Sequence, residues 1–171
     1  MNPDPADAPI ELVPYDPTWP ALFARECERL APLLANWLVA PIEHVGSTAV
    51  VGLLAKPVID LMAPVHDLAS SRPAIEALVG FGYCYFPYRA EVMHWFCRPS
   101  AAHRTHHLHL VSYQSALWRE RLAFRDALRR DGALAEEYAT LKRELAERHR
   151  FDRDAYTDGK LPFLERVLRH R

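Results

Sequence analysis

The sequence predicts one α+β domain, in which a mixed β-sheet is flanked by helices and the last third of the chain is helical. Strand-like apolar runs gather in the middle of the chain, and amphipathic helical patterns lie on both sides of them. No internal repeat or linker divides the sequence, and half of its 171 residues are hydrophobic. We therefore expect a disordered, proline-rich tail over 1–9 and a single domain over 10–171.

The first predicted elements are a short edge segment near Ile10 and a helix that starts at Asp16 and Pro17. Aspartate favours the N-cap of a helix, and proline favours the first helical position. We expect Pro32 to kink or break this helix. Apolar residues three and four apart predict its buried stripe, namely Phe23, Cys27, Leu30, Leu34 and Trp37.

Five strands and one helix are predicted for the middle of the chain. The strands are expected over 42–45, 58–65, 83–88, 92–98 and 106–113. A helix that begins near Pro73 and stops at Gly80 separates the second strand from the third. Because the last three strands follow one another closely, we expect them to pair as hairpins or as a meander.

The chain becomes helical from Ser115 onward, with a break at Asp131 and Gly132. The helix after this break carries charges typical of an exposed, salt-bridged face, namely Glu136, Glu137, Lys142, Arg143, Glu144 and Arg148. A last helix is expected to carry four regularly spaced residues, Tyr156, Lys160, Phe163 and Val167.

Composition narrows the class of protein. A formal net charge of -1 argues against polymeric DNA or RNA as a partner, because such binding needs a strong positive field. Three cysteines without a C-x-x-C pair fit neither a disulfide framework nor a structural zinc site. The N-terminus lacks the features of a secretion signal, and no uncharged apolar run approaches the roughly 20 residues that cross a membrane. We expect a cytoplasmic protein without a membrane segment.

The segment from Glu43 to Asp60 carries the clearest chemical pattern. Gly46 after a strand allows the backbone to approach a phosphate closely, and the Ser47 hydroxyl can donate to its oxygens. The alternative is an ordinary turn with a helix cap. Asp60 shares one face of its strand with Met62, away from the apolar set. Its carboxylate can hold Mg²⁺ or Mn²⁺, or can simply hydrogen-bond to the turn.

His107 and His109 are two residues apart on a predicted strand, so both imidazoles point to one face. Together with Asp60 they would favour a transition metal such as Zn²⁺, because imidazole binds these ions better than Mg²⁺. The alternatives are hydrogen-bonded strand residues, an anion-binding patch or a general base. Arg104 and Lys56 are candidate phosphate contacts.

The run from Glu43 to Asp60 resembles the signature of the GrpB family and, more widely, the nucleotidyltransferase fold of the DNA polymerase β type. In that pattern Gly-Ser opens a short helix between two strands, and the second strand bears carboxylates. The segments 15–20, 104–110 and 156–160 are also similar to the GrpB family, so the resemblance covers nearly the whole chain. It departs from the wider pattern at Met62, where a second acid is expected.

The resemblance implies a nucleotidyltransferase-like protein that binds a nucleoside triphosphate and a divalent metal and transfers a nucleotidyl group to an unknown acceptor. The implied metal ligands and catalytic residues are Asp60, His107 and His109. The implied nucleotide contacts are Gly46, Ser47, Lys56, Arg104, Tyr156 and Lys160. Two alternatives stay open, a non-catalytic domain for a nucleotide or a coenzyme A-like ligand and a metal-dependent phosphohydrolase. Family members fused to dephospho-CoA kinase suggest the coenzyme A-like ligand.

Overall fold

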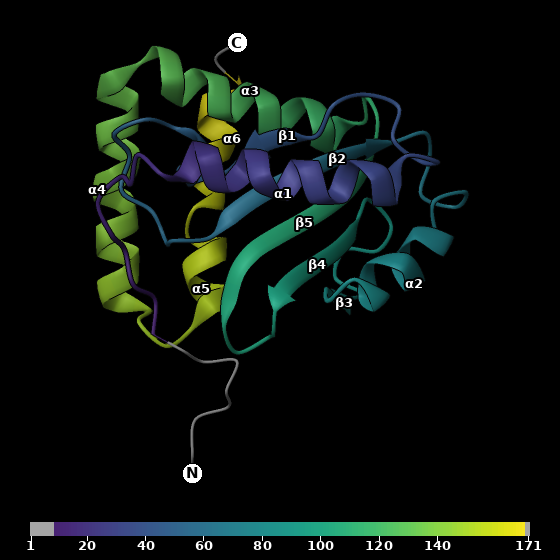
Figure 1. Ribbon diagram of the computed structural model, residues 1–171. Coiled ribbons are helices and arrows are strands. Elements are labelled where there is room, and N and C mark those ends of the chain that lie inside the picture. Colours follow the sequence, from purple (N-terminus) through teal and green to yellow (C-terminus); the bar gives the residue numbers. More distant parts are fainter. Residues whose placement is uncertain (1–8, 170–171) are drawn as a thin grey trace.

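The computed structural model describes residues 9–169, and they form a five-stranded mixed sheet between two layers of helices (Figure 1). The strands are β1 Glu43–Val45, β2 Ile59–Val65, β3 Cys84–Phe86, β4 His94–Pro99 and β5 Arg104–Ser112. The helices are α1 Trp19–Leu34, the 3-10 turn η2 Ser47–Ala49, α2 Pro73–Gly80, α3 Ala116–Arg130, α4 Gly132–Arg148, α5 Arg153–Asp158 and α6 Leu161–Arg169. The predicted α+β class with a helical C-terminal third is confirmed. Of the expected tail over 1–9, residues 1–8 lie outside the described part of the chain.

The sheet has the order β1-β2-β5-β4-β3, and its central pair is parallel. All other neighbours are antiparallel. β3, β4 and β5 follow one another as a meander, as the short spacing between them predicted. The meander returns the chain beside β2 from the far side of the sheet, so residues of β2 and β5 that are far apart in the sequence become neighbours.

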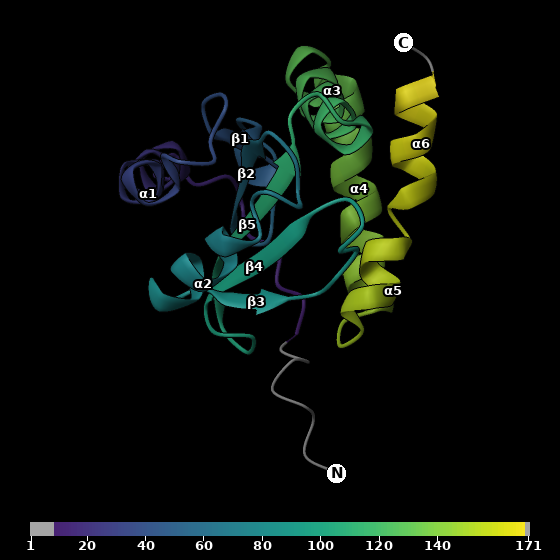
Figure 2. The same ribbon diagram turned by 90° about the vertical axis from the view of Figure 1, so that its right-hand side faces the viewer.

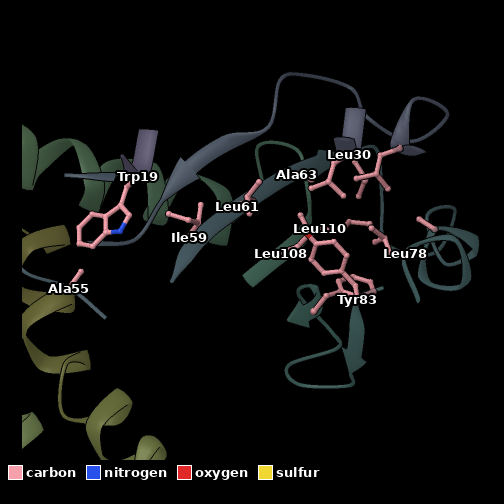
Figure 3. Close-up of a cluster of buried hydrophobic side chains, with 14 residues drawn as sticks. Trp19, Leu30, Ala55, Ile59, Leu61, Ala63, Leu78, Tyr83, Leu108 and Leu110 are labelled. Atoms are coloured by element: carbon pink, nitrogen blue, oxygen red, sulfur yellow. The ribbon is translucent and has the colours of Figure 1, made fainter. Parts of the chain in front are cut away.

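The two faces of the sheet have different roles. Helices α1 and α2 cover one face, and α3 to α6 lie on the other side (Figure 2). Alternate residues of β2 and β5, including Ile59, Leu61, Leu108 and Leu110, point towards α1 and α2 and are buried. Figure 3 shows this main core around them. Burying each such side chain contributes about 1.5–3 kcal/mol, so the core fixes which residues of these strands are left for the opposite face.

Three helix predictions were wrong in detail. α1 begins at Trp19, because the Asp16 carboxylate accepts hydrogen bonds from the backbone and hydroxyl of Thr18 and so shapes the turn before the helix. It continues through Pro32 to Leu34. The expected last helix is two helices, since α5 ends at Asp158 and α6 starts at Leu161. No helix among residues 9–169 is long and apolar enough to span a membrane.

Glu26 attaches α1 to the sheet. Its carboxylate is buried and accepts hydrogen bonds from the Tyr83 hydroxyl at 2.6 Å, from Arg98 at 2.7 Å and from Arg29 at 2.9 Å. Burial raises the pKa of Glu26, but these donors lower it by more, so the carboxylate stays ionised at neutral pH.

We expect Glu26→Ala to lower the free energy of unfolding by about 3–5 kcal/mol, because it leaves the Arg98 guanidinium and the Tyr83 hydroxyl without their buried acceptor. Chemical denaturation of both proteins would measure this change. Glu28→Ala, at an exposed position of the same helix, should change the stability by no more than about 0.5 kcal/mol. Equal effects of the two substitutions would contradict the assigned role of Glu26.

Candidate functional site

Asp60, His107 and His109 meet on the sheet face that looks towards α3 to α6. The parallel register places Asp60 beside His107 and Met62 beside His109. His107 Nδ1 lies 3.0 Å from Asp60 Oδ1, and His109 Nε2 lies 3.7 Å from the same oxygen. One ligand atom from each of the three side chains falls within 4.8 Å of the others. The structure therefore brings together the three residues that the sequence singled out as metal ligands.

The carboxylate of Asp60 is ionised, and His109 is neutral at neutral pH. Burial raises the pKa of Asp60, but the hydrogen bond with His107 and the nearby imidazole of His109 hold it well below its usual range. Burial lowers the pKa of His109 to about 3, and the neighbouring Arg121 guanidinium contributes to this shift. The site thus combines one anion with an uncharged imidazole, while the Asp60 side chain is still 25% exposed.

Arg121 is a member of this site that the sequence did not suggest. It lies on α3, and its Nη1 is 3.3 Å from His109 Nε2. Burial lowers its pKa, and the Asp60 charge opposes that shift. An arginine on an amphipathic helix gives no sign in the sequence that it points to the sheet, so only the packing of α3 against β5 places it here.

Position 46 requires a glycine, because its backbone adopts a positive φ and lies very close to Asp60. Its backbone has a φ of 72° and a ψ of -173°, a region that essentially only glycine adopts. A Cβ atom at this position would lie 2.4 Å from Asp60 Oδ2. We expected the backbone amides at the start of a helix to bind a phosphate here. The helix that follows Gly46 is the η2 turn of only three residues, so it offers few such amides. Ser47 instead faces Lys142, whose Nζ lies 3.1 Å from its hydroxyl oxygen.

All three lysines of the chain gather around this site. Of the 21 lysine and arginine residues only three are lysines. Lys142 also donates to the backbone oxygen of Leu54. Lys160 Nζ lies 4.4 Å from the centroid of the Tyr156 ring, and Lys56 Nζ lies 5.2 Å from it. Tyr156 therefore acts as a shared aromatic platform that holds two ammonium groups together.

Burial perturbs the pKa of each lysine. It lowers the pKa of Lys142 to about 7, with smaller contributions from Lys160 and Arg143. It lowers the pKa of Lys160 to about 8, where Lys56 adds to the shift and Asp60 opposes it. The pKa of Lys56 is also lowered by burial. Lys56 and Lys160 interact electrostatically with Asp60, whereas Lys142 interacts with Lys160 and hydrogen-bonds to Ser47.

The prediction of an exposed face on α4 was wrong for Lys142, which is only 2% exposed. Its neighbours Arg143 and Glu144 are exposed, as predicted. Helical periodicity could not distinguish the buried Lys142 from its exposed neighbours. Lys142 is buried because its amine donates to acceptors on a distant segment, Ser47 and Leu54. The scarcity of lysine in an arginine-rich chain was the one available sign.

Arg104 and Met62 lie at the borders of the site. The Arg104 guanidinium carbon is 5.2 Å from the centroid of the Trp95 ring, and that ring is 5.2 Å from the His107 ring. Arg104 thus lies on the β4 side of the site, and it also interacts electrostatically with Lys56. Met62 is fully buried in an apolar cluster with Leu117 and Trp118 of α3. A second carboxylate at position 62 would be buried in that cluster without solvent.

A cavity beside α4 does not contain this cluster. It has a volume of about 760 Å³ and lies between the N-terminal segment, the turn after η2 and α4. Leu12, Leu53 and Ala139 are among its lining residues, and none of the predicted site residues lines it. The candidate functional site is therefore the sheet face that carries Asp60, His107 and His109. The cavity is mostly lined by residues without catalytic side chains.

The sequence model of a protein family described as GrpB protein matches residues 9–170. The chain belongs to the GrpB family. A UPF0157 protein of Pseudomonas aeruginosa is 40% identical over 95% of this GrpB chain and 67% of its own length. The crystal structure of GrpB from Enterococcus faecalis has a TM-score of 0.84 and 29% identity, covering 94% of this chain and 96% of that one. A dephospho-CoA kinase of Mycolicibacterium paratuberculosis is 29% identical over 96% of this chain but only 46% of its own length.

We expect Gly46→Ala to destabilise this GrpB protein by at least about 1–3 kcal/mol, because the new methyl group adds a clash with Asp60 to the backbone strain. Gly52→Ala is the control, since Gly52 also has a positive φ of 81° but has no atom within 4 Å of the added Cβ. In an Asp60→Ala background, Gly46→Ala should cost less, and thermal denaturation of the four proteins would show this coupling. Strictly additive effects would mean that the two residues do not contact each other.

We expect Lys142 to make the stability depend on pH. The ordinary pKa of a lysine side chain is 10.5, and the pKa of Lys142 in the fold is about 7, so between these values the unfolded chain binds more protons. The free energy of unfolding should therefore rise with pH in this window, by at most about 1.4 kcal/mol per pH unit from this group. Lys142→Met should remove this part of the slope in denaturation curves, whereas Glu144→Ala at an exposed neighbouring position should leave it. Parallel curves for wild type and Lys142→Met would contradict a buried, neutral lysine.

Proposed function

We propose that this GrpB protein binds a nucleoside triphosphate and a divalent metal at the sheet face and transfers a nucleotidyl group to an acceptor. The observation that carries the proposal is the convergence of Lys56, Lys160 and Arg121 on a single carboxylate, Asp60, with Lys142 beside Lys160 and hydrogen-bonded to Ser47. Burying several cations around one anion is costly unless a further anion offsets them. A polyphosphate supplies such an anion.

Lysine can fill this role because its compact ammonium group binds phosphate as a point charge. Lys142 has a pKa of about 7, so it can bind phosphate when protonated or accept a proton when neutral. Lys56 and Lys160 share the ring of Tyr156 and would bind the phosphates from the α5 side. Ser47, held by Lys142, would donate its hydroxyl to a phosphate oxygen.

The Asp60, His107 and His109 side chains fit a divalent metal. Asp60 is ionised and His109 is neutral, which are the protonation states that ligands require. His107 Nδ1 and His109 Nε2 are the ring atoms that face Asp60 Oδ1, at 3.0 Å and 3.7 Å. Two imidazoles and one carboxylate favour Zn²⁺ or Mn²⁺ over Mg²⁺. A metal bound there would neutralise phosphate charge, and Arg121 would have to release the imidazole of His109.

The transfer would proceed by attack of an acceptor hydroxyl oxygen on the α-phosphorus. The bond between that phosphorus and the bridging oxygen breaks, and pyrophosphate leaves with the bond electrons. The proton of the acceptor hydroxyl passes to a base, for which neutral Lys142 is the proposed group. The lysines bind the phosphates in place and offset the charge that develops on the leaving pyrophosphate.

The second candidate is a domain that binds a nucleotide or a coenzyme A-like ligand without turnover. The observation that favours it is the full burial of Met62 among apolar side chains, since a site with a single carboxylate lacks the second acid of a two-metal centre. The similarity to a dephospho-CoA kinase makes coenzyme A a sensible test ligand.

A thermal-shift and calorimetric titration with the four nucleoside triphosphates and coenzyme A tests the proposal, each with Mg²⁺, Mn²⁺, Zn²⁺ or a chelator. At a ligand concentration of about 100 Kd, binding should stabilise the fold by about 2.7 kcal/mol, which raises the melting temperature by several degrees. Asp60→Asn should abolish the metal-dependent part, and Lys160→Met should weaken phosphate binding more than Lys160→Arg.

Glu144→Gln, at an exposed position of α4, is the control and should bind as wild type does. Products are then assayed with the ligand that binds. Release of pyrophosphate only when an acceptor is added supports nucleotidyl transfer, whereas release of inorganic phosphate without an acceptor indicates a phosphohydrolase. Binding without any product supports the second candidate. If no triphosphate binds with any metal, the proposed function is wrong.

A further inference from the structure

An aromatic cluster borders the lysine site at the open edge of the sheet. Phe86 on β3 pairs with Trp95 on β4, and Trp95 pairs with His109 on β5. Residues directly opposite one another on neighbouring antiparallel strands point to the same face. Phe86 and Trp95 therefore lie on the face that carries Asp60, His107 and His109.

The rings contact one another and leave part of their surface accessible. The centroids of Phe86 and Trp95 are 5.4 Å apart, and those of Tyr88 and Trp95 are 6.4 Å apart with the rings at 72°. Tyr88 is 54% exposed, whereas Phe86 and Trp95 are partly buried. An exposed tyrosine next to a half-buried tryptophan offers ring surface to a planar ligand.

Cations accompany these rings. The guanidinium carbon of Arg104 lies 5.2 Å from the centroid of Trp95. Arg121 interacts electrostatically both with Tyr88 and Arg89 on this side and with Asp60 on the other. Aromatic rings together with arginine are the surfaces on which single nucleobases stack in proteins, and each stacked base contributes about 1–3 kcal/mol.

His107 joins the two groups of residues. Its ring lies 5.2 Å from that of Trp95, and its Nδ1 lies 3.0 Å from Asp60 Oδ1. A ring stacked beside Trp95 and Tyr88 would therefore have its attached phosphates near Asp60, with which Lys56 and Lys160 interact electrostatically. This connectivity matches a nucleotide, in which a short sugar separates the base from the phosphates.

We propose that Phe86, Tyr88 and Trp95 form the subsite for the nucleobase of the ligand whose phosphates bind at the lysine cluster. This inference rests on the proposed function and adds the residues that would recognise the base of the nucleotide, so that the ring as well as the phosphates is bound. Arg104 lies at the border of the subsite and would contact the edge of the ring or the α-phosphate.

The test measures the affinity of ATP, adenosine and inorganic tripolyphosphate by calorimetry, with Mn²⁺ present throughout. We expect Tyr88→Ala and Trp95→Leu each to weaken ATP and adenosine by about 5- to 150-fold, which corresponds to the loss of one stacking contact. The affinity of tripolyphosphate should stay unchanged, because it has no ring. Tyr88→Phe keeps the ring and should bind ATP as wild type does.

Tyr113→Ala is the matched control, since Tyr113 is a comparably exposed tyrosine that contacts Trp118 outside the cluster. Circular dichroism and thermal melting would establish that each variant is folded. Equal losses for ATP and tripolyphosphate, or an unchanged ATP affinity in both ring variants, would overturn the nucleobase subsite.

The same three ligands separate this inference from the proposed function. If adenosine binds in a Tyr88-dependent way while tripolyphosphate does not bind, the subsite stands and the phosphate site fails. If tripolyphosphate binds and the ring variants have no effect, the phosphate site stands and the subsite fails. If wild type binds none of the three, both are wrong.

Discussion

The parallel pairing of β2 with β5 is the constraint on which the rest of the site depends. It brings Asp60 beside His107, although 47 residues of chain separate them. The same register directs Leu61 and Leu108 into the main core. A slip of one residue would move the polar set to the apolar face and the apolar set to the polar face. The energy that fixes the core therefore also fixes the alignment of the candidate ligands.

Charge is concentrated locally in a chain whose net charge is close to zero. Lys142 and Lys160 are held between the sheet and the C-terminal helices, where burial lowers the pKa of both amines. Hydrogen bonds from Lys142 and the ring of Tyr156 offset part of the cost of their burial. The field that remains is positive around one carboxylate. Such a field attracts a small polyanion, whereas a nucleic-acid polymer requires a wide basic surface.

The surroundings determine from which side a ligand can approach. Met62, Leu117 and Trp118 close the site on the α3 side with an apolar cluster. The half-exposed ring of Tyr88 borders it on the β3 side. Between these limits the Asp60 side chain is still partly exposed. A ligand would therefore lie along the sheet face, from Lys142 of α4 and Lys160 in the turn after α5 towards the rings at β3 and β4.

Local patterns in the sequence were sufficient for the elements and for part of the site. Alternation along β2 predicted that Asp60 faces away from the apolar residues, and the spacing of His107 and His109 predicted that they share a face. These features follow from the geometry of a single strand, so one strand's sequence determines them. The helix limits near Asp16 and the division into α5 and α6 were missed. The division between α5 and α6 falls at Gly159, where a Cβ atom would lie 2.5 Å from a Leu145 side-chain carbon of α4, so this close contact depends on the tertiary structure.

Only the tertiary structure decided which distant residues complete the site. Lys142 and Arg121 look like ordinary charges on amphipathic helices, and no local pattern indicates that Gly46 lies against Asp60. Their positions depend on how α3 and α4 pack against the sheet and on the distance between Gly46 and Asp60. The sequence by itself determined the fold class and the faces of single strands, because short-range periodicity encodes them, and the resemblance of its motifs identified the family. The surplus of positive charge and the neighbouring aromatic cluster arise from contacts between segments far apart in the chain, which no local pattern records.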